Sequence, residues 1–159
     1  MIFEKKYRTD RGFECLSICI SNYMKYLNFN ISTSDIFLLG KGYELYYNGF
    51  IDNPKISTDI YASNFRFLNK SKISYHYANC VEDQLSNYLD NMVDREEMII
   101  LRVGTSFLDY SRAHSSATQA FHCINVIGRK DNDYIISDGV IPTLKATSYQ
   151  GKISKEKLI

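Results

Sequence analysis

Residues 11–27 read RGFECLSICISNYMKYL, and this stretch decides the fold. Its apolar side chains recur at intervals of three and four residues, a spacing that forms one stripe along a helix and fits no strand. The stripe consists of Leu16, Ile20, Tyr23, Met24 and Leu27. Asp10 and Gly12 precede it as start signals, so Cys15 is predicted in the first turn. Unpaired N–H groups and the helix dipole favour a thiolate there, and a nucleophilic cysteine is therefore expected.

The composition describes an ordinary globular protein. The chain has 159 residues, enough for one domain, and we expect a single domain over 1–159. Because the net charge is +1, nothing attracts the chain to nucleic acid or to an anionic membrane. No window reaches the roughly 18 apolar residues of a membrane span, and residues 1–6 lack the apolar core that a signal peptide would show. Four irregularly spaced cysteines predict no disulfide framework, so the expected location is the cytoplasm.

Periodicity and turn residues predict an α+β chain. Helices are expected at 11–27, 32–39, 57–68 and 81–92, and strands at 73–77, 98–103, 121–128 and 134–138. The apolar run 98–103 is typical of a central strand that is covered on both faces. Residues 40–54 are predicted to form loops that could line a pocket, and residues 104–119 a long loop over a cleft. The last six residues look like a helix cut off after its start, which suggests the N-terminal domain of a longer protein.

His122 and Asp138 lie on the two arms of a predicted hairpin. A three-residue loop centred on Lys130 places them opposite each other, and one centred on Asp131 makes them diagonal neighbours on one face. An even-length loop places them on opposite faces unless a bulge intervenes. On a shared face, Asp138 can hold the imidazole in one tautomer and leave its other nitrogen free to act on a thiol.

The order Cys15, His122, Asp138 resembles the papain-like cysteine hydrolases. The helix, the following stretch SDIFLLGKG (34–42) and the hairpin resemble the N-terminal domain of the butirosin-biosynthesis protein H family, over roughly residues 11–145. The resemblance implies a papain-like α+β fold, with an N-terminal helical part and a C-terminal antiparallel sheet. It further implies that Cys15 is the nucleophile, His122 the base and Asp138 its partner.

The same resemblance implies the reaction and its partners. An acyl group would pass from the thioester of an acyl or peptidyl carrier protein, through Cys15, to a small-molecule amine. The setting would be specialised-metabolite biosynthesis of the antibiotic or non-ribosomal peptide type. The substrate would bring a phosphopantetheine arm, so no cofactor is expected in the chain itself. No metal is expected either, because Cys15-x-x-x-Cys19 is not a usual zinc spacing.

Two alternatives stay open. A peptidase of the type that removes double-glycine leaders needs the same three residues, but such enzymes usually carry a glutamine shortly before the cysteine and a glycine after it. This chain has Thr9 and Asp10 upstream and Leu16 downstream, so an oxyanion hole needs the N–H of Cys15 and another donor. The second alternative is a binding or scaffold domain without chemistry.

The remaining candidate residues have simpler interpretations. Cys19 lies one turn deeper in the helix and is expected in the core, although it is a possible nucleophile. Cys123 is expected on the strand face opposite to His122. His114 is expected on the surface, and Asp138 could be no more than a turn residue before Gly139.

Overall fold

The computed structural model describes residues 6–48, 55–79, 81–116, 120–142 and 147–158. Within these ranges it contains helices and an antiparallel sheet, so the α+β prediction is confirmed. The predicted loop tip at 49–54 and Cys80 lie outside the described residues. None of the helices described has the length and apolar character needed to cross a membrane. The three described cysteines, Cys15, Cys19 and Cys123, carry free thiols.

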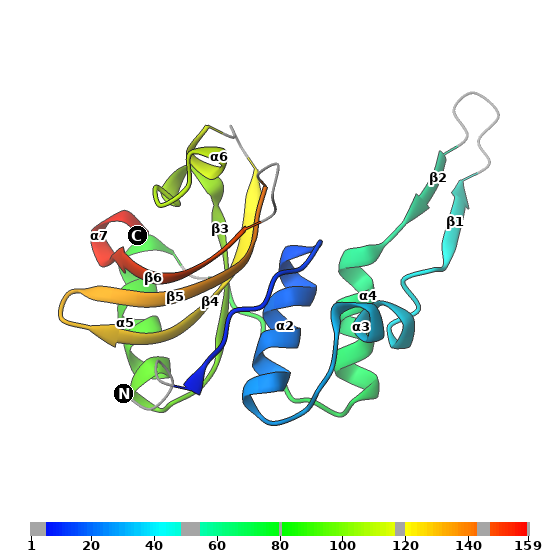
Figure 1. Cartoon of the computed structure of the whole chain (residues 1–159), viewed down its shortest axis with the longest axis horizontal. Coiled ribbons are helices and arrows are strands. Elements are labelled where there is room, and N and C mark those ends of the chain that lie inside the picture. The colour runs from blue at the N-terminus through cyan, green and yellow to red at the C-terminus, as the bar shows by residue number, and fades with distance from the viewer. Residues whose placement is uncertain (1–5, 49–54, 80, 117–119, 143–146, 159) are drawn as a thin grey trace.

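A four-stranded antiparallel sheet forms the larger half of the molecule (Figure 1). Its order is β3 (Ile99–Gly104), β4 (Phe121–Lys130), β5 (Asp133–Ile141) and β6 (Thr147–Ser154). Helix α5 (Glu82–Asp94) packs its apolar side chains against one face of the sheet. Helix α2 packs on the other face, beside β4 and β5. One apolar cluster therefore lies between α5 and the sheet, and another between α2 and the sheet.

Helix α2 (Cys15–Tyr26) follows the prediction closely, and Leu16, Ile20 and Met24 of its apolar stripe are buried. Tyr23 is half-buried, and Leu27, at the C-cap position, is 42% exposed. Its cap differs from the predicted start signals, because the carboxylate of Glu14 accepts the free N–H groups of the first turn. Asp10 instead forms an ion pair with Lys25 near the end of the helix, with an N–O distance of 2.6 Å. Cys15 is nonetheless the first helical residue, as the sequence predicts.

The helical half continues with α3 (Thr33–Leu39) and α4 (Ile60–Lys70). Ser32 begins α3 with a capping box, since its hydroxyl accepts the N–H of Asp35 while that side chain accepts the N–H of Ser32. Strands β1 (Leu45–Asn48) and β2 (Lys55–Thr58) pair as a hairpin that extends away from the rest of the molecule (Figure 1). Strand β1 occupies residues 45–48 of the predicted loop, and α4 begins three residues later than predicted.

Three strand predictions need correction. The run at 98–103 becomes β3, which is an edge strand and not a central one, because no described strand pairs with its outer side. Residues 73–77 alternate like a strand but form no ladder, and Tyr75 instead packs on Phe65, with ring centroids 5.7 Å apart. The polar segment that becomes β6 was not predicted. Its apolar alternation is weak because Gly151 stands between Tyr149 and Ile153 on its more buried face.

The predicted long loop contains two short helices, a 3₁₀ helix η1 (Thr105–Phe107) and α6 (Arg112–Ser115). The predicted start of a C-terminal helix is confirmed as α7 (Lys155–Leu158). The β4–β5 hairpin is also confirmed.

A two-residue turn and a bulge set the register of that hairpin. Lys130 pairs with Asp133, so the turn consists of residues 131–132 and has an even length. Asp131 adopts a left-handed conformation with φ of 57°, which Asp tolerates better than most residues. Between Val126 and Gly128 the pairing shifts by one residue, because a bulge inserts one residue into β4. Beyond the bulge, the register is therefore that of an odd-length loop.

Candidate active site

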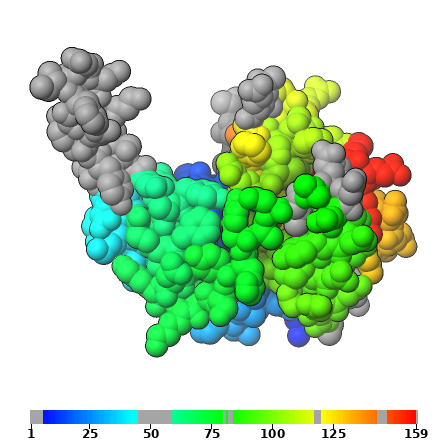
Figure 2. All heavy atoms as spheres, turned by 180° about the vertical axis from the view of Figure 1, so that it is seen from behind, coloured from blue at the N-terminus to red at the C-terminus, as the bar shows by residue number. Residues whose placement is uncertain are grey.

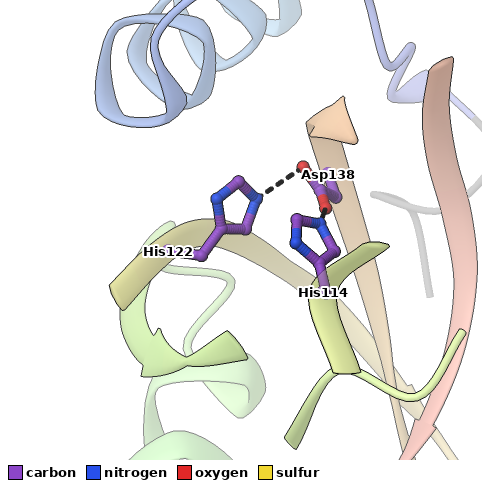
Figure 3. A group of neighbouring side chains, drawn as sticks. All are labelled: His114, His122 and Asp138. Carbon is purple, nitrogen blue, oxygen red and sulfur yellow. Dashed lines mark hydrogen bonds and ion pairs between the residues drawn. The ribbon is translucent and has the colours of Figure 1, made fainter. Parts of the chain in front are cut away.

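The bulge brings His122 and Asp138 to the same face of the sheet. The Nε2 atom of His122 donates a hydrogen bond to Oδ1 of Asp138 over 2.8 Å, and both side chains are buried (Figure 3). The predicted His122–Asp138 pair therefore forms, and of the predicted arrangements it is the even-length loop combined with a bulge. Because Nε2 is occupied, Nδ1 is the ring nitrogen left for another partner.

Asp138 accepts hydrogen bonds at both carboxylate oxygens. Oδ1 also accepts the backbone N–H of Val140 over 2.8 Å. Oδ2 accepts the hydroxyl of Tyr110 over 2.8 Å and Nε2 of His114 over 2.9 Å. Asp138 is 0% exposed and sits within a strand, so its interpretation as a turn residue is wrong. Four donors fix both the position and the orientation of this carboxylate.

His114 is the residue that the sequence interpretation misplaced. It is only 2% exposed, and from the short helix α6 it reaches Oδ2 of Asp138, with its ring centroid 4.4 Å from that of His122 (Figure 3). The prediction of a surface histidine is therefore wrong. A signal existed in the sequence, because one of the three histidines, His114, lies within the polar connection 104–119 and another, His122, lies shortly after it. Because this connection is long and polar, the sequence predicts an exposed histidine there.

The hydrogen bonds around Asp138 determine its charge and that of His122. Burial raises the pKa of Asp138, but hydrogen bonds from His114 and His122 outweigh it and hold this pKa well below the usual value. Burial lowers the pKa of His122, whereas hydrogen bonds to Asp138 and Cys15 raise it, with a net result of about 9. Asp138 is therefore an anion and His122 an imidazolium at neutral pH.

Cys15 begins α2 and is partly exposed. Hydrogen bonding from the Cys123 thiol, opposed by burial and assisted by His122, lowers the pKa of the Cys15 thiol. Glu14 acts in the other direction, because its carboxylate Oε1 lies 3.6 Å from the Cys15 sulfur. The balance favours a thiolate next to the His122 imidazolium.

Two glycines bring the start of α2 against the strand that carries Asp138. The N–H of Gly12 donates to the carbonyl of Gly139 over 3.0 Å. A Cβ atom on Gly12 would lie 2.7 Å from the side chain of Ile18, and one on Gly139 would lie 2.5 Å from it. Both distances are shorter than real Cβ contacts. The absence of side chains at these two positions therefore lets Cys15 approach the His122–Asp138 pair.

The side chain of Glu14 caps the N-terminus of α2, where the sequence predicts that free N–H groups stabilise a Cys15 thiolate. Its Oε1 accepts the N–H of Leu16 over 2.9 Å, and its Oε2 accepts both the N–H and the hydroxyl of Ser17, each over 2.6 Å. Asn64 adds a third donor to Oε2 at 3.1 Å. Because this carboxylate engages two N–H groups of the first turn, these donors are not free to stabilise a Cys15 thiolate, and hydrogen bonds with Cys123 and His122 lower the pKa of Cys15.

The other candidate residues take structural roles. Cys19 is fully buried, burial raises its pKa, and its thiol donates to the carbonyl of Cys123 over 3.4 Å. The hydroxyl of Thr9 bonds to the side chains of Ser137 and Gln150, each over 2.7 Å. Thr9 is therefore engaged with the sheet and does not supply the oxyanion donor that a glutamine would supply in this region.

One cluster in the described part of the chain has the geometry of a metal site. Ligand atoms of His114, His122 and Asp138 lie within 4.8 Å of one another. However, Nε2 of each histidine already donates to a carboxylate oxygen of Asp138. A metal would have to replace both hydrogen bonds, so the observed contacts fit a proton-bearing network better than a metal centre.

Comparison with known families gives one result. The family model described as "Butirosin biosynthesis protein H, N-terminal" matches residues 14–139, which is most of the chain. The match runs from the capping residue Glu14 to Gly139 and so includes Cys15, His122 and Asp138. No curated protein matches the chain significantly.

Proposed function

The chain belongs to the butirosin biosynthesis protein H N-terminal family, and from that premise we propose that it is an enzyme domain that transfers acyl groups through a thioester on Cys15. The observation that carries the proposal is the buried His122–Asp138 pair, held by a 2.8 Å hydrogen bond, together with Cys15 at the start of α2, where the pKa of its thiol is lowered. This is the arrangement that activates a cysteine nucleophile in papain-like enzymes, and the α+β architecture is compatible with such a fold.

The first half of the reaction acylates the enzyme. The Cys15 thiolate attacks the carbonyl carbon of an acyl thioester, a new C–S bond forms, and the bond to the carrier sulfur breaks. The leaving thiolate takes the proton from the His122 imidazolium. The products are a free carrier thiol, an acyl-enzyme and a neutral imidazole.

The second half transfers the acyl group to the acceptor. An amine attacks the Cys15 thioester, a C–N bond forms, and Cys15 leaves as a thiolate. His122 takes the proton that the amine loses, which regenerates the imidazolium. Asp138 stays ionised in both halves, because its low pKa keeps it from competing for this proton.

The substrates follow from the family and are part of the proposal. The family is named for the biosynthesis of butirosin, an antibiotic, so we place this domain in antibiotic biosynthesis in the cytoplasm. The acyl donor would be an acyl or peptidyl carrier protein with its phosphopantetheine arm, and the acceptor a small-molecule amine. The carrier brings the arm, so the domain needs no cofactor of its own.

Intact-mass analysis after incubation with an acyl-pantetheine thioester tests the proposal. We expect the native chain to gain the mass of one acyl group, Cys15→Ala to gain none, and His122→Ala to react at least a hundredfold more slowly. The matched control is Cys19→Ala, which removes a thiol one turn further along α2 and should still acylate. An adduct that persists in Cys15→Ala, or none on the native chain, would contradict the mechanism.

A further inference from the structure

A pocket of about 430 Å³ lies between the helical half and the sheet. Pockets for small molecules occupy roughly 300–1,000 Å³. This one follows α2 from Leu16 to Met24, and β3 from Arg102 back to Met98, which precedes that strand. Figure 2 shows the outer face of this region, where α4 and residues 73–79 lie beside α5.

The wall of the pocket is mostly apolar, with Ser74, His76 and several tyrosines along it and charged residues at its two ends. Its apolar side chains include Leu16, Ile20, Met24, Phe65, Leu68 and Ile100. At one end, the Arg102 guanidinium lies over the rings of Phe121 and Tyr61, at 4.5 and 5.7 Å. At the other end lie Glu96 and Glu97. Because the apolar part of this wall is the larger one, an apolar acyl chain would gain free energy by leaving water for the pocket.

The Arg102 end of the pocket adjoins the candidate nucleophile. Leu16 follows Cys15 in the chain and Cys123 follows His122, and both residues line the pocket. Cys15 itself packs against the apolar cluster that contains Leu16 and Cys123. Arg102 and Cys123 are direct partners across the β3–β4 ladder, which places the guanidinium at the same end. An acyl group attached to the Cys15 sulfur can therefore extend from there along α2.

The dimensions of the pocket limit the length of such a chain. Leu16 and Met24 are eight residues apart in a helix, so the wall between them is about 12 Å long. Since a C–C bond measures about 1.5 Å, an extended chain advances roughly 1.3 Å per carbon, and about nine carbons fill this length.

We propose that this pocket is the acyl site, and that the acyl group carried by Cys15 is an apolar chain of medium length. The proposal rests on the acyl transfer described above and specifies its donor. In this proposal the thioester carbonyl lies at Cys15, and the acyl chain extends from there between α2 and β3. The Arg102 guanidinium lies at the entrance of the pocket and does not contact the far end of the acyl chain.

Acylation rates with a series of acyl-pantetheine thioesters test the site. From acetyl to octanoyl, each added methylene should raise the second-order rate of Cys15 acylation roughly fourfold, the factor that corresponds to burying one CH₂. The rate should stop rising beyond about nine carbons, because a longer acyl chain no longer fits within the pocket. A rate that is independent of chain length, while Cys15 still acylates, would overturn the proposal.

A matched pair of tryptophan variants locates the effect. Ser74 lines the pocket from the irregular segment 73–77, so Ser74→Trp should fill part of it without disturbing a helix or strand. We expect the octanoyl-to-acetyl rate ratio to fall at least tenfold. Asn69→Trp adds the same side chain at an exposed position of α4 outside the pocket and should leave the ratio unchanged. Equal ratios in the two variants would contradict the assignment.

A binding measurement separates the pocket from the chemistry. The thioether S-octyl-pantetheine cannot transfer its chain, and calorimetry with Cys15→Ala measures its binding without a nucleophile. We expect S-octyl-pantetheine to bind at least a hundredfold more tightly than S-ethyl-pantetheine. If this difference holds but no thioester acylates the native chain, the acyl transfer is wrong and the apolar site stands. If the two probes bind equally, the apolar site is wrong whatever the acylation result.

Discussion

The charge state of Cys15 depends on a few hydrogen bonds. Hydrogen bonds with Cys123 and His122 lower the pKa of the Cys15 thiol, whereas the charge of Glu14 raises it. His122 is held in turn by Asp138, and Asp138 by His114, Tyr110 and a backbone N–H. The reactivity of one sulfur atom therefore depends on residues from α2, α6, β4 and β5, and each contact predicts a measurable effect.

The pH dependence of alkylation measures the first contact. Iodoacetamide reacts with the thiolate, and the lowered pKa of Cys15 should keep its rate high well below pH 8.5, the ordinary cysteine pKa. In His122→Gln the midpoint should rise, because the imidazolium that helps to lower the pKa of Cys15 is lost, although the hydrogen bond from Cys123 remains. Peptide mapping assigns the adduct to Cys15. Equal midpoints in the two proteins would show that His122 does not influence the thiol.

His114 is predicted to be a positioning residue. His114→Leu removes a donor from a buried carboxylate and should lower the free energy of unfolding by about 1.5–3 kcal/mol. It should also lower kcat with little change in KM and alter the alkylation pH profile, because Asp138 then holds His122 less firmly. His114→Gln keeps an amide N–H where Nε2 lies and should restore much of both. A purely structural role would leave the pH profile of His114→Leu unchanged.

At the scale of elements, the site depends on how closely α2 approaches the end of β5. Gly139→Ala would place a Cβ atom 2.5 Å from Ile18 and 2.6 Å from the carbonyl oxygen of Asp10. Because a backbone atom is one of the two, we expect a cost of about 1–3 kcal/mol in the free energy of unfolding and slower alkylation of Cys15. The control is Gly104→Ala, whose Cβ would meet the half-exposed ring of Phe107 at 3.3 Å. Denaturant unfolding of both variants checks the difference, and equal costs would refute it.

The elements also show how far the sequence could predict this structure. The helix that contains Cys15, the helix predicted at 32–39 and the β4–β5 hairpin follow from local patterns, and the structure confirms them. The edge position of β3 and the strand β6 depend on which segments pair across the chain, and no local pattern encodes that. The burial of His114 depends on a bond to Asp138, 24 residues away, so its polar surroundings were misleading.

At the scale of the whole molecule, the apolar cluster that contains Leu158 of α7 is separate from the cluster against which Cys15 packs. Helix α7 ends the described chain and buries Leu158, which is 4% exposed, in the cluster shared by α5 and the sheet. Lys155 forms an ion pair with Asp90 of α5, with an N–O distance of 2.6 Å. Contacts far from Cys15 therefore hold the core together.

Leu158→Ala tests this separation. The loss of a buried leucine side chain should cost about 2–5 kcal/mol in the free energy of unfolding. The alkylation pH profile of Cys15 should not change under conditions in which the variant stays folded. Leu38→Ala, at a position that is 58% exposed, should change stability by no more than about 0.5 kcal/mol. A shifted pH profile in Leu158→Ala would show that the two regions are coupled.

The two-residue turn and the bulge in the β4–β5 hairpin have a consequence for the evolution of the family. Each alone would rotate Asp138 to the wrong side of the sheet, and together they cancel, so the side of the carboxylate depends on parity. A single insertion or deletion between His122 and Asp138 therefore separates the pair, whereas a compensated double change preserves it. Relatives that retain the chemistry should differ in this interval by even numbers of residues, or should gain or lose a bulge with each odd change.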